Sequence, residues 1–191
     1  MLVIASGNPH KVAELSAMLA PIDLEVRAKP RHLEIEETGS TYAANARLKA
    51  EVVARTTGEW SLADDSGLEV DALGGRPGIH SARYAPSDPE RIHRLLHELG
   101  GSPYRSARFV SAMALARPDG VVVLESEGVC QGLILHEPEG CGAGFDPVFF
   151  VREAGSSYAC MGENLRLRLG SRGKAARALA PGLRRCFGLT G

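Results

Sequence analysis

The stretch RSARFVSAMALARPDGVVVLESEGVCQGLIL, residues 105–135, decides the fold because it predicts a long β-hairpin. Two extended runs flank Pro118-Asp119-Gly120, whose residue types favour a turn. Strands joined by so short a connection run antiparallel. The second half of the chain is therefore expected to contribute a long antiparallel pair to a sheet.

Shorter elements alternate before and after this hairpin. The expected strands, from apolar runs, are residues 2–6, 24–26, 60–64 and 146–151. The expected helices, from apolar spacing, caps and stops, are 9–19, about 41–55, 88–99 capped by Asp88, and 171–180 ending before Pro181. Alternating strands and helices followed by a long antiparallel pair predict an α/β fold with a mixed sheet.

Composition narrows the class of protein. The 191 residues are 44% hydrophobic, enough for a core in one domain, residues 1–191, or one domain with two lobes. A net charge of −1 argues against a general nucleic-acid coat or a basic membrane-surface protein. The four cysteines form no CxxC pair, and the N-terminus has no signal-peptide pattern. We expect a cytoplasmic protein with free thiols.

The turn SGNPHK, residues 6–11, joins the first expected strand to the first expected helix. Backbone N–H groups at a helix start, together with the helix dipole, favour anions. Lys11 would add a positive charge, and Asn8 could hydrogen-bond a phosphate or a ribose. The phosphate-binding pattern GxxxxGK[ST] is absent. An ordinary strand-to-helix turn explains this stretch equally well.

Acidic residues gather in two other segments. In EIEETGSTYAANARLKA, residues 34–50, Asn45 and Lys49 share a helix face that could meet phosphates or a metal-bound water, or simply face solvent. In ADDSG, two adjacent aspartates follow an apolar run, which indicates either an acidic turn or a cation site at a strand end. Mg²⁺ takes one or two carboxylates plus substrate phosphates, and Asp65 with Glu36 would supply such a pair.

Two later segments carry further candidates. GCGAGFDPVFF, residues 140–150, has glycines that allow a ligand close to the backbone; Phe145 could stack on a base and Asp146 could accept hydrogen bonds. A hairpin-like loop is the alternative. GSRGKAARAL, residues 170–179, places Arg172 and Lys174 at a helix start, where positive charge suits an anionic ligand or a carbonyl-rich base edge. Exposed basic residues are the alternative there.

Taken together, these segments resemble the inosine triphosphate pyrophosphatase (Ham1-like) family over about residues 2–180. The motifs occur in family order, namely SGNPHK, EETGSTYAANARLKA, ADDSGLEVDALGGRPGIHSARYA, GFDPVF and SRGKA. The resemblance implies an elongated mixed α/β fold with two lobes, a central cleft and a homodimer. It also implies Mg²⁺-dependent hydrolysis of non-standard purine nucleoside triphosphates to the monophosphate and pyrophosphate.

The resemblance assigns roles to individual residues. Asp65 matches the proton acceptor, and Glu36 and Asp65 match the metal ligands. The implied triphosphate contacts are Ser6, Gly7, Asn8, Pro9, His10 and Lys11, with Lys49 expected to neutralise the leaving pyrophosphate. The implied contacts to the rest of the substrate are Ser66, Ala143, Gly144, Phe145, Asp146, Arg166, Ser171 and Arg172.

The C-terminal part departs from the family pattern. The family reads serine-histidine-arginine where this chain has Gly170-Ser171-Arg172, so Ser171 replaces a histidine, and Arg166 stands where a lysine is usual. These positions help to recognise the 6-keto edge of the purine. Two alternatives to the stated activity therefore stay open, namely a related pyrophosphatase with altered base selectivity and a nucleotide-binding protein without turnover.

Overall fold

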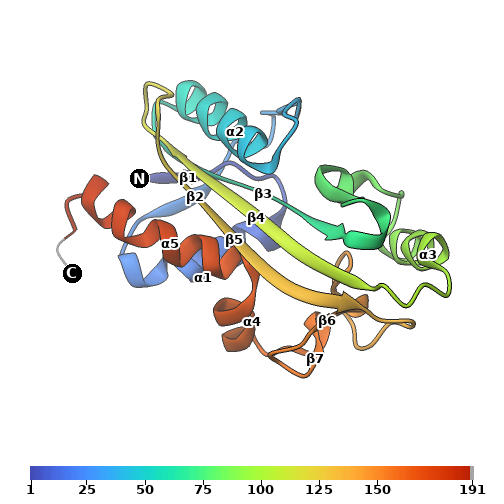
Figure 1. Ribbon diagram of the computed structural model, residues 1–191. Helices are drawn as coiled ribbons and strands as arrows, with labels where there is room; N and C mark the ends of the chain where they lie inside the picture. The colour runs from blue at the N-terminus through green and yellow to red at the C-terminus, as the bar shows by residue number, and fades with distance from the viewer. Residues whose placement is uncertain (190–191) are drawn as a thin grey trace. The chain divides into compact units, whose positions relative to one another are not determined.

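A computed structural model describes residues 1–189, and within them seven strands form one mixed sheet in the order β2-β1-β3-β4-β5-β6-β7 (Figure 1). The strands are β1 Leu2–Ile4, β2 Val26–Ala28, β3 Trp60–Val70, β4 Ser106–Ala116, β5 Val122–Ile134, β6 Phe149–Val151 and β7 Ser156–Ser157. The helices are α1 Pro9–Leu19, α2 Tyr42–Thr57, α3 Asp88–Leu99, α4 Glu163–Leu169 and α5 Ser171–Cys186. The α/β fold with a mixed sheet is confirmed.

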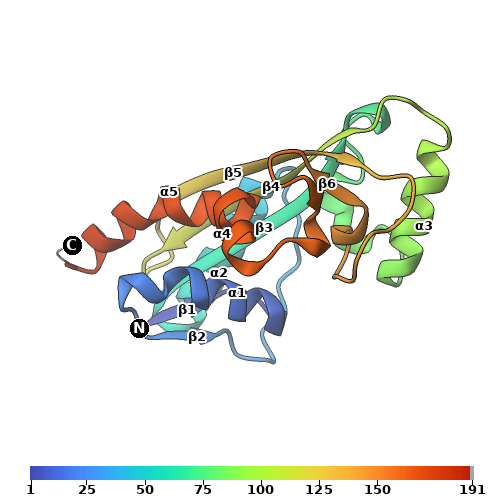
Figure 2. The ribbon, with the colours of Figure 1, turned by 90° about the horizontal axis from the view of Figure 1, so that it is seen from below.

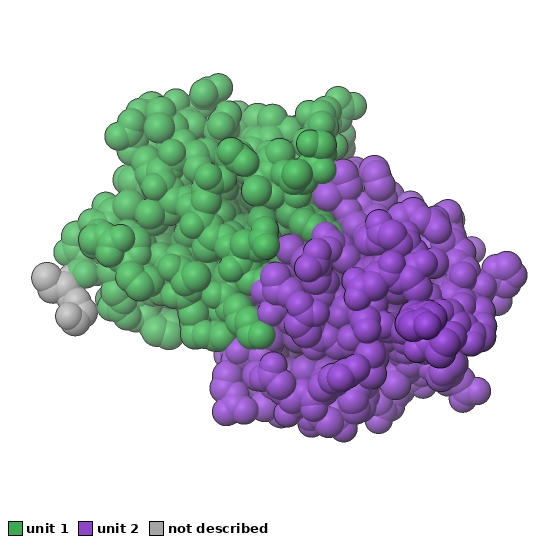
Figure 3. All heavy atoms as spheres, viewed as in Figure 1, with its two compact units in different colours: residues 1–65, 111–128, 172–191 green, residues 66–110, 129–171 purple. Residues whose placement is uncertain are grey.

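The chain forms two compact units, which are interleaved along the sequence (Figure 3). Unit 1 contains residues 1–65, 111–128 and the segment from 172 onward, and unit 2 contains residues 66–110 and 129–171. Strands β3, β4 and β5 each contribute residues to both units. The middle of each long strand is therefore where the chain passes from one unit to the other.

In unit 1, helices cover both faces of the sheet (Figures 1 and 2). Strand β1 is the parallel partner of both β2 and β3, with Ile4 opposite Ala28 and Leu62. Because side chains alternate along a strand, neighbouring residues enter different cores. Leu2 and Ile4 pack with α1 and α5, whereas Val3 and Ala5 pack with α2.

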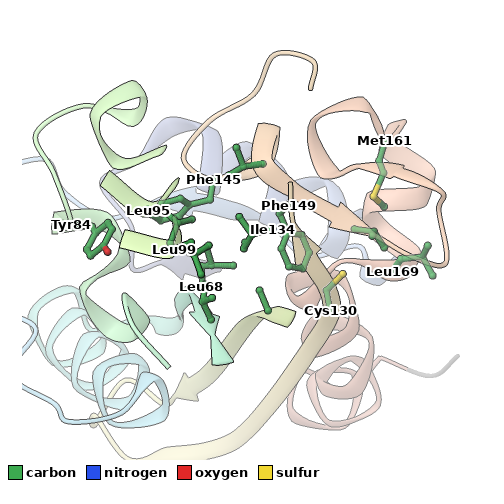
Figure 4. Packing of buried hydrophobic residues seen from close by; sticks show 14 residues of the cluster. Leu68, Tyr84, Leu95, Leu99, Cys130, Ile134, Phe145, Phe149, Met161 and Leu169 are labelled. Atoms are coloured by element: carbon green, nitrogen blue, oxygen red, sulfur yellow. The ribbon is translucent and has the colours of Figure 1, made fainter. Parts of the chain in front are cut away.

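Unit 2 has a separate apolar core (Figure 4). Side chains from β3, α3, β5, β6 and α4 meet there, including Leu68, Leu95, Ile134, Phe149 and Leu169. All five are buried. This core anchors the segment that leads from β5 through the glycine-rich loop into β6.

Most elements lie where the sequence predicts them. The hairpin is confirmed, since β4 and β5 are sheet neighbours and Arg117 N donates to Val121 O at 3.0 Å. Helix α1 spans the expected residues, with Pro9 in its first turn. Helix α2 has Thr41 as N-cap and Gly58, at φ +67°, as C-cap.

Several boundaries differ from the prediction. Strand β1 ends at Ile4, β2 begins at Val26, and β6 begins at Phe149 because residues 146–148 form a 3-10 turn. Strand β7 and helix α4 were not predicted.

Strand β3 continues to Val70, so the two aspartates lie within the strand rather than at its end. Helix α3 is capped by Ser87, which forms a capping box with Glu90, and Asp88 is its first residue. Helix α5 continues past Pro181 because its apolar face extends to the fully buried Leu183.

The described residues contain no helix with the length and apolarity needed to cross a bilayer. The four cysteines are free thiols.

Candidate functional site

The two aspartates of β3 point to opposite faces of the sheet in unit 1, as strand alternation requires. Asp64 is in contact with cations from α1 and α5: Lys11 Nζ lies 3.3 Å from Asp64 Oδ2, and Arg172 Nη2 lies 3.2 Å from the same oxygen. Arg172 Nη1 also donates to Glu14 Oε2 at 2.5 Å. A buried carboxylate thus joins the starts of α1 and α5.

Opposing effects act on the pKa of Asp64. Burial raises it, but the Arg172 guanidinium and the Lys11 ammonium outweigh burial and lower the pKa from 3.8 to about 2. Asp64 is therefore ionised throughout the neutral range. Its ion pairs with Lys11 and Arg172 hold its side chain in place and link α1 and α5 to β3.

Asp65 faces α2. Lys49 Nζ lies 3.2 Å from Asp65 Oδ1 and 2.8 Å from Glu37 Oε1, and it also donates to the carbonyl of Asp64 at 2.7 Å. Asn45 Nδ2 donates to Asp65 Oδ2 at 3.0 Å, and Asn45 Oδ1 accepts from Gly39 N at 2.8 Å. Both side-chain oxygens of Asp65 are therefore oriented by α2.

Burial raises the pKa of Asp65 above 3.8, with Glu37 raising it further, against the opposing effects of Lys49 and Asn45. Neighbouring carboxyl groups thus have pKa values displaced in opposite directions. This separation is typical of sites in which one acid holds structure and the other exchanges a proton.

The turn of residues 6–11 begins where β1 ends. Ser6 Oγ accepts from Asn8 N at 3.2 Å, and Asn8 Oδ1 accepts from His10 N at 2.9 Å, so Asn8 is the N-cap of α1. Gly7, Asn8, Pro9 and His10 are exposed, which leaves this helix start accessible to an anion.

Lys29 also lies beside this turn, although the sequence patterns did not predict it as a site residue. Its Cε and Nζ lie 3.7 Å from the position that a Cβ on Gly7 would take, and its Nζ donates to the carbonyl of Leu33. Parallel pairing of β1 and β2 brings their carboxyl ends to one edge, and Lys29 directly follows β2. The position of Lys29 shortly after an expected strand is the sequence signal that could have predicted its place beside the turn.

Other site residues of unit 1 were also missed. Glu37 and Glu14, which contact Lys49 and Arg172, carry no pattern that singles them out. Glu36, the predicted metal ligand, is exposed, and its neighbour Glu37 is the residue that contacts Lys49. In this arrangement the structure brings Asp65, Lys49, Asn45 and Glu37 together.

The predicted base-binding residues lie in unit 2, except Arg172, which belongs to unit 1. Phe145 is buried in the core of that unit, with its ring 6.1 Å from that of Tyr84, so stacking on a base stays a prediction. Asp146 Oδ2 lies 3.6 Å from Arg166 Nη1, and Arg166 also donates to the carbonyls of Met161 and Ala159. Ala143 is exposed; Gly144, Ser66 and Arg166 are half-buried; Ser171 is buried.

The donor set of unit 1 is compatible with a hard cation. Carboxylate oxygens are the ligands that Mg²⁺ prefers, and it binds through one or two of them plus phosphates. Within residues 1–189, no three His, Cys, Asp or Glu side chains come together as a complete metal site. The Lys49 ammonium lies between Glu37 and Asp65 and offsets part of their negative charge. A metal held partly by substrate phosphate fits this arrangement.

Comparison with known proteins gives full-length matches. The sequence profile of the Ham1 family matches residues 2–182. The "dITP/XTP pyrophosphatase" of Nostoc sp. is 51% identical over 182 residues, 95% of this chain and 93% of the relative. The protein of the same name from Parasynechococcus marenigrum is 51% identical over 183 residues, 95% of this chain and 94% of the relative.

Solved structures agree with the sequence matches. The Ham1 protein of Staphylococcus aureus has a TM-score of 0.86 at 35% identity, covering 96% of this chain and 98% of that chain. A nucleoside-triphosphatase / dITP/XTP pyrophosphatase from Mycobacterium abscessus has a TM-score of 0.75 at 38% identity, with 96% and 99% covered. The motif resemblance is thereby confirmed, and the chain belongs to the Ham1 family.

Proposed function

We propose that the protein hydrolyses dITP, XTP and ITP to the nucleoside monophosphate and pyrophosphate. The observation that carries the proposal is the Asp65–Lys49–Asn45 cluster on β3 and α2, together with an accessible helix start that follows the neighbouring strand β1, in a chain 51% identical to proteins named dITP/XTP pyrophosphatase. The cluster supplies a carboxylate with a raised pKa, and the helix start supplies an anion site.

The reaction requires water to attack the α-phosphorus while the bond to the β-phosphate oxygen breaks. Asp65 accepts the proton of the attacking water, because its pKa is raised and its two oxygens are oriented by Lys49 and Asn45. The ionised Asp64 keeps Lys11 and Arg172 in place. The products are the monophosphate and pyrophosphate.

Lys11 from α1 and Lys49 from α2 are both assigned to the phosphates in this proposal. Residues 6–11 bind the triphosphate through backbone N–H groups, and Lys11 and Lys49 neutralise the departing pyrophosphate. Lys29, beside Gly7, adds a third ammonium. Such catalysis consists mostly of positioning and charge neutralisation.

Mg²⁺ is the metal we propose, held by Asp65 with Glu36 or Glu37, and it would neutralise phosphate oxygens. Glu36 is the ligand implied by the family motif. Glu37 is the carboxylate that lies with Lys49 in the structure. Separate Glu36→Gln and Glu37→Gln variants, titrated with Mg²⁺, decide between them.

Base recognition is assigned to Ser66, Ala143–Asp146, Arg166, Ser171 and Arg172. A donor that faces a 6-keto oxygen would be left opposite an amino group by adenine, at a cost of about 1–3 kcal/mol. Ser171 in place of the family histidine favours one second candidate, a pyrophosphatase with relaxed base selectivity.

A substrate panel tests the proposal. Pyrophosphate release is measured with ITP, dITP, XTP, GTP and ATP, with and without Mg²⁺, for the wild type and Asp65→Asn. The proposal expects Mg²⁺-dependent turnover of the first three substrates and its loss in a folded Asp65→Asn protein. Rates with ATP equal to those with the 6-keto purine substrates would favour relaxed selectivity, and absence of all turnover would favour a nucleotide-binding protein. Homodimer formation and a cytoplasmic location stay predictions, the first testable by light scattering.

A further inference from the structure

A carboxylate at the start of α3 contacts the glycine-rich loop of unit 2, residues 140–144. Asp88 Oδ2 accepts a hydrogen bond from the backbone N–H of Gly144 at 2.7 Å. The two residues are 56 positions apart in sequence, so this is a tertiary contact. Hydrogen bonds with an ionised acceptor are about twice as strong as neutral ones.

The Asp88 side chain is also held in place by contacts that do not involve the loop. Arg91 Nη1 donates to Asp88 Oδ1 at 2.7 Å, and Arg91 Nε donates to the carbonyl of Ala85 at 3.0 Å. Ser87 and Glu90 close the capping box at the same helix start. The acceptor for Gly144 therefore has its orientation set by α3 rather than by the loop.

The loop packs loosely against the helix that holds it. A cavity of about 530 Å³ separates α3 from the loop; its wall includes Asp88, Pro89 and Ile92 from the helix and Pro138, Gly142 and Pro147 from the other side. Residues 136–143 are exposed throughout. Gly144 has a φ of +57°, a conformation that glycine adopts without strain.

We propose that Asp88 is a positioning residue for nucleobase binding, acting through the Gly144 N–H to hold residues 143–146 in their binding conformation. This inference rests on the proposed function, in which those residues contact the base. Phe145 is buried in the core, but the exposed residues before Gly144 border an open cavity and have little apolar packing to replace the bond. Loss of the Asp88 carboxylate therefore loosens the base-binding segment. It leaves unchanged the contacts of Asp65 and those of the phosphate turn, residues 6–11.

The experiment compares three variants with the wild type. Asp88→Ala removes the acceptor, whereas Asp88→Asn removes the charge and keeps an oxygen for Gly144. Glu90→Ala breaks the capping box of the same helix turn without contacting the loop, and so controls for a weakened α3. If Asp88→Ala does not fold, Asp88→Ser replaces it, because its hydroxyl is too short to reach Gly144.

Two measurements separate this inference from the proposed function. Amide hydrogen exchange of residues 142–146, measured without nucleotide, reports how readily the loop opens, and it does not depend on which substrate the enzyme hydrolyses. Steady-state kinetics with XTP, and inhibition by inorganic tripolyphosphate, then report base and phosphate binding separately.

We expect faster exchange in Asp88→Ala, a KM for XTP raised about tenfold, kcat within about twofold of the wild type, and unchanged inhibition by tripolyphosphate. Asp88→Asn should restore most of the affinity, and Glu90→Ala should keep the wild-type KM. Unchanged exchange in Asp88→Ala, or an equal KM rise in Glu90→Ala, overturns the inference. A wild type without turnover contradicts the proposed function instead, and the exchange result still decides whether Asp88 holds the loop.

Discussion

Arg172 Nη2 lies 3.2 Å from Asp64 Oδ2, so the first turn of α5 is tied to the buried middle of β3. The same carboxylate oxygen receives Lys11 from α1. The carboxylate of Asp64 thus joins β3 to α1 and α5, which are distant in sequence. In this arrangement Arg172 has partners within unit 1, and its contact with a base edge stays a prediction.

Replacement of Asp64 by asparagine should destabilise the protein. The substitution keeps the shape but leaves Lys11 and Arg172 near a neutral group, so the free energy of unfolding at pH 7 should fall by about 2–3 kcal/mol. Urea denaturation measures the change. Asp119→Asn, which alters an exposed ion pair, serves as control and should change stability little. Equal stabilities of Asp64→Asn and the wild type would contradict the anchor role.

The pH dependence of stability should also report Asp64. Its pKa is about 2 in the folded protein and near 3.8 when unfolded, so the unfolded state binds the proton more readily. The stabilisation is complete above pH 3.8 and is lost as the pH falls toward 2, by about 2 kcal/mol in total. Metal-free unfolding curves from pH 5 to 2 measure it. If Asp64→Asn lost the same stability between pH 5 and 2, the loss would come from other titrating groups.

Gly39 should be intolerant of a side chain because of its place beside Asn45. A Cβ there would lie 2.6 Å from Asn45 Oδ1 and 2.9 Å from Asn45 N. Gly39→Ala must therefore displace Asn45, which orients Asp65. We expect kcat to fall at least about tenfold, at a stability cost of about 1–3 kcal/mol. Gly101→Ala, with open space around its Cβ, is the matched control and should behave as wild type.

Local sequence patterns predicted most of the helices and strands, but they could not predict α4, β7 or the contacts between elements. The hairpin and α1 follow from turn residues and apolar spacing within a few positions. The extension of α5 through Pro181 follows from burial of Leu183, which depends on distant strands. Likewise, alternation predicts that Asp64 and Asp65 face opposite ways, but only the packing of α2 shows that Lys49 and Glu37 meet Asp65.

Lys29 should strengthen phosphate binding. Its ammonium has three N–H donors, one of which is used by the carbonyl of Leu33, and it lies beside Gly7 at the start of the phosphate turn. Lys29→Gln should raise the KM for XTP about fivefold, roughly 1 kcal/mol, and weaken inhibition by tripolyphosphate equally, since both ligands carry the phosphates. Arg31→Gln, an exposed charge two residues away, controls for the change in net charge. Lys29→Arg should retain most of the affinity. A KM in Lys29→Gln no higher than that of Arg31→Gln would show that Lys29 serves only to hold the loop through Leu33.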